Sequence, residues 1–230
     1  MSQEILQEQI EYYRKRAEEY DEWFYRKGRY DRGAELNQLW FDEAKQVRQE
    51  LLQNPPVETA LELACGTGIW TQELVKVARN ITALDASPEV IEINRTKLNS
   101  PAITYEQVDL FEWEPQRQYE LVFFSFWLSH VPPELLSAFL NKIYRATKPG
   151  GHCFLIDSRL EPTSTAKDAP LREDETIYRT RKLNDGSSFK VVKIFYEQAE
   201  LSESLSAVGF VPDIKVTPHY FIYGSATKPS

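Results

Sequence analysis

Residues 57–68, VETALELACGTG, contain the pattern that decides the fold of this chain. An apolar run that carries one acid, Glu62, ends in the turn CGTG at 65–68, and a helix-like segment follows. A buried parallel strand that leads through a glycine turn into a helix places backbone N–H groups beside a bound ligand. The glycines allow that ligand to approach the backbone closely. The stretch therefore predicts a site for a nucleotide-type cofactor.

The composition restricts the class of protein. The chain has 230 residues, of which 42% are hydrophobic and 27% charged, which is typical of a globular domain with a large core. Its net charge of −8 makes nucleic acid an unlikely partner, because a polyanion would need a local basic patch. We find no apolar run of about 18 residues, and the N-terminus is too charged for a signal peptide.

Both cysteines, Cys65 and Cys153, lie in apolar segments. This placement is typical of reduced, intracellular cysteines. We therefore expect a cytoplasmic protein with no membrane partner. We also expect a monomer or a homodimer.

Strands and helices alternate through the middle of the chain. The expected strands are 58–64, 81–85, 102–106, 119–126 and 151–157. The expected helices are 69–79, 88–98 and 133–146. This alternation predicts a parallel sheet covered by helices on both faces, with right-handed connections.

The two ends of the chain differ from this pattern. We expect helices over 3–27 and 34–52, and a helix over 197–208 followed by a last strand over 214–223. Before this last helix, a polar loop over 158–176 precedes two segments, 177–183 and 189–195. They flank Asn-Asp-Gly-Ser and predict an antiparallel hairpin.

The economical interpretation is a single domain over residues 1–230. Its expected parts are a helical lid (1–54), a cofactor-binding core (55–157), a substrate-pocket insertion with a hairpin (158–195) and a C-terminal helix and strand (196–230).

Acidic residues stand at the ends of three successive predicted strands. Because parallel strands end at one edge of a sheet, Glu62, Asp85 and Asp109 should converge beside the glycine turn. Asp85 lies 19 residues after Gly66, the spacing of an acid that binds ribose hydroxyls. A dinucleotide-binding fold has the same spacing, but Thr71 stands where its fingerprint has Gly or Ala.

Six segments together resemble the class I S-adenosylmethionine-dependent methyltransferases over nearly the whole chain: LELACGTG, LDAS, VDLFEW, LVFFSFWLSHVPPE, TKPGGHCFLID and YFIYG. The resemblance implies an α/β fold with a doubly wound, mostly parallel seven-stranded sheet, an antiparallel C-terminal strand and an N-terminal helical lid. It implies S-adenosylmethionine as cofactor and S-adenosylhomocysteine as product. The chain departs from the family at Ala64, where many members carry glycine.

The resemblance also implies a cofactor site. The set is Glu62, Ala64, Gly66 and Gly68 for the methionine and sugar portions, Asp85 for the ribose diol, Ala86, Asp109 and Leu110 for the adenine, and Ser125 for the ammonium group, with Phe111 beside them. This cofactor has no phosphate, and the chain accordingly has no lysine near the glycine turn.

Tyrosines are concentrated near the N-terminus. One helical face of segment 3–27 carries Tyr13, Ala17, Tyr20 and Phe24. One hypothesis is a lid that excludes water and places Tyr13 and Tyr20 near the sulfonium, since aromatic faces attract cations. Small-molecule members of the family often carry a similar lid. The alternatives are an amphipathic helix docked on the sheet and, less favoured because of the neighbouring acids, an RNA-binding surface.

His130 is the candidate base, because it follows the fourth expected strand near the point where the methyl group should emerge. A structural role is the alternative. The three histidines are far apart and form no Cys/His cluster, so we expect no metal. Substrate contacts are expected from Tyr30, Trp127, Arg159 and Arg179, the arginines as ligands of a carboxylate.

We therefore expect methyl transfer to an O, N or C atom of a small-molecule acceptor, by in-line displacement in a lid-closed pocket. A methyltransferase that acts on tRNA or protein is the first alternative. A nicotinamide-dependent oxidoreductase that uses Tyr144 and Lys148, and a non-catalytic cofactor-binding protein, are the others.

Overall fold

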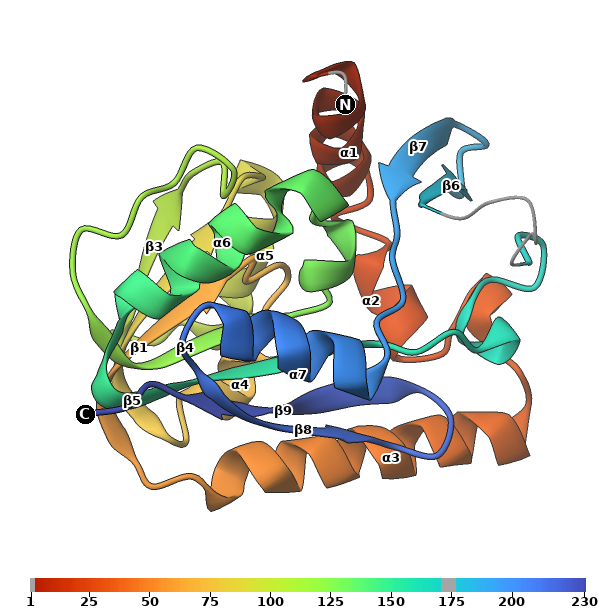
Figure 1. Ribbon diagram of the computed structural model, residues 1–230. Helices are drawn as coiled ribbons and strands as arrows, with labels where there is room; N and C mark the ends of the chain where they lie inside the picture. The colour runs from red at the N-terminus through yellow and green to blue at the C-terminus, as the bar shows by residue number, and fades with distance from the viewer. Residues whose placement is uncertain (1–2, 171–176) are drawn as a thin grey trace.

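The computed structural model describes residues 3–170 and 177–230, so part of the predicted loop 158–176 lies outside the described residues. Seven strands form one sheet in the order β3-β2-β1-β4-β5-β9-β8 (Figure 1). Their bounds are β1 Val57–Leu63, β2 Ala78–Asp85, β3 Ile103–Gln107, β4 Tyr119–Ser125, β5 Thr147–Ser158, β8 Val211–Val216 and β9 Phe221–Thr227. All neighbours are parallel except β9, which runs antiparallel to both β5 and β8. The predicted sheet with an antiparallel C-terminal strand is confirmed.

Helices cover both faces of this sheet (Figure 1). Strand β4 shows why, since its side chains alternate between two separate apolar cores. Leu121 and Phe123 pack with α3, α4 and α5, whereas Val122 and Phe124 pack with α6 and α7. The bounds of these helices are α3 Ala34–Gln53, α4 Thr71–Leu74, α5 Pro88–Leu98, α6 Pro133–Ala146 and α7 Gln198–Ala207.

The predicted hairpin forms, but outside the main sheet. Strands β6 (Tyr178–Lys182) and β7 (Ser188–Val192) pair antiparallel as a separate sheet of two strands. Helix α1 (Gln3–Lys15) lies beside β7 above the main sheet (Figure 1). The side chains of Tyr12 and Val191 share a small apolar core between them.

Three predicted elements differ in detail. The expected helix over 3–27 is two helices, α1 and α2 (Tyr20–Phe24), separated by turns that bury Arg16 and Ala17. The expected helix over 69–79 shortens to α4, because β2 already begins at Ala78. The expected last strand over 214–223 is two strands, β8 and β9, joined by a turn.

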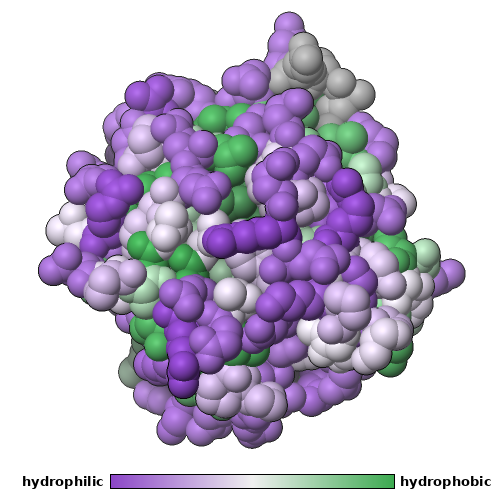
Figure 2. Space-filling view, turned by 90° about the vertical axis from the view of Figure 1, so that its left-hand side faces the viewer, coloured by the Kyte–Doolittle hydropathy of each residue, from purple (hydrophilic) through white to green (hydrophobic). Residues whose placement is uncertain are grey.

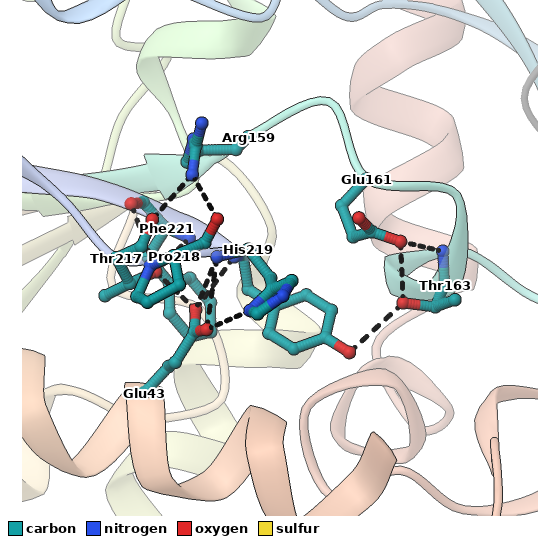
Figure 3. Close-up of polar contacts among 9 residues, drawn as sticks. Glu43, Arg159, Glu161, Thr163, Thr217, Pro218, His219 and Phe221 are labelled. Carbon is teal, nitrogen blue, oxygen red and sulfur yellow. Dashed lines mark hydrogen bonds and ion pairs between the residues drawn. The ribbon is translucent and has the colours of Figure 1, made fainter.

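That last turn is held by a buried acid of α3 (Figure 3). Glu43 accepts hydrogen bonds from the Thr217 hydroxyl and from the backbone N–H groups of His219 and Tyr220, the last at 2.8 Å. From the end of β5, Arg159 donates to the carbonyls of Thr217 and Pro218 at 2.6 and 2.7 Å. The reversal between β8 and β9 is thus fixed by tertiary contacts.

The side of the molecule seen in Figure 2 is mainly hydrophilic, with hydrophobic residues in small separate groups. Within residues 3–170 and 177–230, no helix combines the length and the apolar character needed to cross a bilayer. Most of the large apolar side chains are instead enclosed in the cores on the two faces of the sheet.

Candidate active site

A cavity of about 690 Å³ lies where β1, β2 and β4 end. Its described lining is Gln9, Ile10, Tyr13, Tyr20, Ala64, Gly66, Asp85, Ala86, Ser87, Val90, Asp109, Leu110, Ser125, Phe126 and Trp127. We call it the cofactor cavity. Most of the residues expected to bind the cofactor line it.

The backbone leaves two strands in an unusual conformation at this cavity. Ala64, after β1, has φ of +53°, and Phe126, after β4, has φ of +52°. For residues other than glycine, this left-handed region costs roughly 1–2 kcal/mol because of the Cβ atom. Such backbone strain concentrates at functional sites. The conformation also explains why glycine suits the position of Ala64.

Asp85 joins the ends of the first two strands. Its carboxylate accepts hydrogen bonds from the backbone N–H groups of Gly66, at 2.9 Å, and of Ser87, at 3.0 Å. Burial raises the pKa of Asp85 above its usual value in spite of these bonds. Asp109 also lines the cavity, and the described lining contains no Lys or Arg. The cavity therefore presents two acids to its ligand.

Three predicted cofactor residues are not in the described lining. Glu62 is buried inside β1, and its Oε2 has no hydrogen-bond partner among the described residues. Gly68 leaves room for Asn94, since a Cβ there would lie 2.7 Å from the Asn94 Oδ1 atom. The Phe111 ring packs against Trp127, with centroids 5.4 Å apart. These residues stand behind the cavity wall.

A second cavity, of about 570 Å³, adjoins the first. Its described lining is Tyr12, Tyr13, Arg16, Tyr20, Trp23, Tyr30, Phe126, His130, Ser158, Ser164, Thr165, Arg181, Lys193 and Phe195. The two cavities share Tyr13, Tyr20 and Phe126. We call the second one the acceptor cavity. The N-terminal segment (residues 3–30) supplies much of its wall, and the β6–β7 hairpin adds Arg181, with Lys193 and Phe195 following β7.

His130 stands in the acceptor cavity with both ring nitrogens engaged. The Val192 carbonyl lies 2.5 Å from Nδ1 and can only accept, so Nδ1 carries a proton and Nε2 accepts from the Tyr13 hydroxyl at 2.6 Å. Burial and the nearby Lys193 ammonium lower the pKa of His130 well below its usual value. The imidazole is therefore neutral, and Tyr13 stands between it and the cofactor cavity.

The residues expected to contact substrate are divided. Tyr30 lines the acceptor cavity and Trp127 the cofactor cavity. The structure places Arg159 at the β8–β9 turn instead. Arg179 is buried 5.9 Å from the Phe195 ring and is not in the described lining of either cavity. Arg181, two residues further on the same face of β6, lines the acceptor cavity in its place.

Sequence reasoning missed Arg16, Lys193 and Gln9. Gln9 accepts from the Val192 N–H at 3.0 Å and donates to the His130 carbonyl at 3.1 Å, which fastens α1 to the hairpin and to the site.

The described part of the chain holds no group of three or more His, Cys, Asp or Glu residues that could bind a metal ion.

Glu62 yields a prediction about pH. Burial raises its pKa to about 8, although a hydrogen bond with Thr71 opposes this. Between pH 4.5 and 8 the folded state therefore keeps a proton that the unfolded state has lost, and stability falls as pH rises. Glu62→Gln removes this titrating group. In urea unfolding of the cofactor-free protein, the free energy of unfolding of the variant minus that of wild type should therefore increase by about 2–4 kcal/mol from about pH 5 to 8.

The matched control is Glu58→Gln, which changes an exposed acid of the same strand. Its pH dependence should follow wild type. If the free energy of unfolding changed with pH in the same way in wild type and Glu62→Gln, the raised pKa of Glu62 would be contradicted.

The sequence matches known methyltransferases. The family model described as a methyltransferase domain matches residues 60–151. An uncharacterized methyltransferase of Synechocystis is 33% identical over 126 residues, which are 54% of this chain and 58% of that protein. Nodulation protein S of Rhizobium tropici is 26% identical over 112 residues, which are 47% of this chain and 46% of that protein. The chain thus spans about half the length of these curated relatives.

Solved structures extend the similarity to the full length. The DhpI complex with S-adenosylhomocysteine (SAH) is 32% identical and superposes with a TM-score of 0.80, covering 100% of both chains. The DhpI complex with SAM and HEP is 33% identical, with the same TM-score of 0.80 and the same 100% coverage of both chains. NodS from Bradyrhizobium japonicum, solved with SAH, is 13% identical at a TM-score of 0.60, covers 88% of this chain and 91% of that chain, and shares the fold. Together with the sheet order and the site at its edge, these matches show that the chain belongs to the class I S-adenosylmethionine-dependent methyltransferases.

Proposed function

We propose that this protein transfers the methyl group of S-adenosylmethionine to an O, N or C atom of a small-molecule acceptor, by in-line displacement beneath an N-terminal lid. One observation carries the proposal. Two cavities meet at Tyr13, Tyr20 and Phe126, and the N-terminal segment contributes to both. Methyl transfer needs this arrangement, because donor and acceptor must be aligned and kept from water.

The cofactor cavity suits S-adenosylmethionine, which supplies a methyl group on a positively charged sulfur. Its two acids and its lack of Lys or Arg among the described lining fit a cationic ligand without phosphate. In this proposal Asp85 holds the ribose diol, and Ala86, Asp109 and Leu110 surround the adenine. Gly66 and Ser125 face the methionine portion, and the buried Glu62 supports it from behind.

His130 takes a positioning role in this proposal. Its Nε2 accepts from Tyr13, so a proton from the acceptor would reach it only through the Tyr13 hydroxyl. The lowered pKa of His130 makes such a proton poorly held. In His130→Asn the transfer rate should fall at least tenfold while the pH–rate profile keeps its shape. An acid limb present in wild type and absent from the variant would identify His130 as a titrating base.

A small acceptor is favoured over tRNA or protein by the acceptor cavity, which the N-terminal segment and the hairpin enclose. DhpI, which has a similar fold over its whole length, was solved with SAM and the molecule HEP together. We also propose that residues 1–230 act as one domain and that the protein works in the cytoplasm.

The direct test uses methyl-labelled S-adenosylmethionine and a cell extract divided into small molecules, RNA and protein. The proposal predicts label in the small-molecule fraction. Label in RNA or protein would favour the macromolecular alternative. Label in no fraction, with the cofactor still bound, would indicate a non-catalytic binding protein.

Asp85 provides the test of the cofactor site. In Asp85→Ala, calorimetry should show S-adenosylmethionine affinity lowered at least tenfold, a loss of about 1.4 kcal/mol. The matched control is Glu106→Ala, an exposed acid on the neighbouring β3. Its affinity should stay within twofold of wild type. Equal binding by Asp85→Ala and wild type would reject the site.

A further inference from the structure

The acceptor cavity carries a charge opposite to that of the cofactor cavity. Arg16 reaches it from the turn after α1, Arg181 from β6 and Lys193 from just after β7. Its described lining includes no Asp or Glu. Three cations from three segments thus surround one small volume.

Arg16 is a buried cation without a counter-ion. Its residue is 9% exposed, and its guanidinium carbon lies 5.0 Å from the ring centre of Tyr20, 5.5 Å from that of Tyr12 and 6.0 Å from that of Tyr30. Its hydrogen bond to the Tyr30 hydroxyl is long, at 3.4 Å. No carboxylate of the described residues forms an ion pair with it. The three ring contacts offset part of the cost of burying this charge, and the remaining guanidinium N–H donors suit an anionic ligand.

Lys193 is only partly compensated. Its buried ammonium contacts the Asp157 carboxylate at 3.2 Å and donates to the Ser129 hydroxyl at 2.7 Å. An ammonium has three N–H donors, so one is left for a ligand. Arg181, half-buried, forms no ion pair within the described ranges. Among the described residues, these three cations and the Asp157 carboxylate that contacts Lys193 leave an excess of two positive charges.

His130 does not alter this balance. Burial and the Lys193, Arg181 and Arg16 charges all lower its pKa, so it remains neutral. Burial raises the pKa of Tyr12, Tyr13 and Tyr20, so these three tyrosines of the lining are neutral as well. Among the residues that the structure describes, an excess of two positive charges is therefore available to a ligand.

We propose that the acceptor carries a doubly charged oxyanion of the phosphate-monoester type, bound between Arg16, Arg181 and Lys193. This inference rests on the proposed function and names the chemical class of its acceptor. Guanidinium groups bind such oxyanions through paired N–H donors. A dianion cancels the excess charge, whereas a carboxylate leaves half of it. Arg16 belongs to the N-terminal segment, whereas Arg181 lies in β6 and Lys193 just after β7. An anion bound between them therefore also fastens the lid to the hairpin.

The experiment is calorimetry on the protein saturated with S-adenosylhomocysteine, at pH 8 and constant ionic strength in chloride. Inorganic phosphate, sulfate and acetate are the probes. Phosphate and sulfate should bind at least tenfold more tightly than acetate. Equal affinities for the dianions and acetate, or no binding above chloride, would overturn the proposal without any variant.

Variants locate the site. Arg16→Gln and Arg181→Gln should each weaken phosphate binding at least tenfold. Lys190→Gln, which removes an exposed cation of β7, should stay within twofold. Wild-type phosphate affinity in Arg16→Gln would overturn the proposal.

The affinity for S-adenosylhomocysteine separates the possible failures. If it is normal while the anions show no preference, the acceptor class is wrong and the proposed transfer stands. If wild type does not bind it, the proposed function itself fails. If Arg16→Gln misfolds and loses its affinity for S-adenosylhomocysteine, the phosphate experiment is repeated with Arg16→Lys. That variant keeps the charge and should retain phosphate binding to within tenfold, and complete loss would count against a charge-based site.

Discussion

Parallel strands end at one edge of a sheet, and this constraint creates the cofactor cavity. β1, β2 and β4 deliver Ala64, Asp85 and Ser125 to the same cavity although these residues are far apart in sequence. At β1 and β4 the chain leaves the sheet in a left-handed conformation, at Ala64 and Phe126. The sharp exits leave the edge open, and Asp85 fixes the first of them by binding the N–H group of Gly66.

Opposite charges on the two sides of one aromatic junction explain the chemistry. On the cofactor side, Asp85 and Asp109 favour a sulfonium, while on the acceptor side Arg16, Arg181 and Lys193 favour an anion. In an enclosed site of low dielectric such charges act more strongly than in water. In the proposed function, these charges would draw a cationic methyl donor and an anionic acceptor into adjacent cavities. Each ligand would fit poorly in the cavity of the other.

Much of this could be predicted from the sequence. Buried parallel strands appear as continuous apolar runs, so the alternation from β1 to β5 was readable, and strand ends identified Asp85 and Asp109. Arg16 and Lys193 could not be found in this way. They lie in a turn and after an edge strand, and only the docking of α1 on the hairpin brings them together.

The remaining differences have similar causes. The expected strand over 214–223 ran through the turn between β8 and β9, and this turn is held by the distant Glu43, which accepts its N–H groups. Arg159 was expected in the pocket because of its position after β5, but carbonyls of that turn engage it. Arg181 lines the acceptor cavity and Arg179 does not, although both stand on β6, so the sequence pattern did not distinguish them.

The most direct measurement is a crystal structure of the protein grown with S-adenosylhomocysteine. The account predicts the adenosyl group against Asp85, Ala86 and Asp109, with the sulfur at the junction of Tyr13, Tyr20 and Phe126, facing the acceptor cavity. A product molecule bound elsewhere, or one whose sulfur points away from that junction, would contradict it.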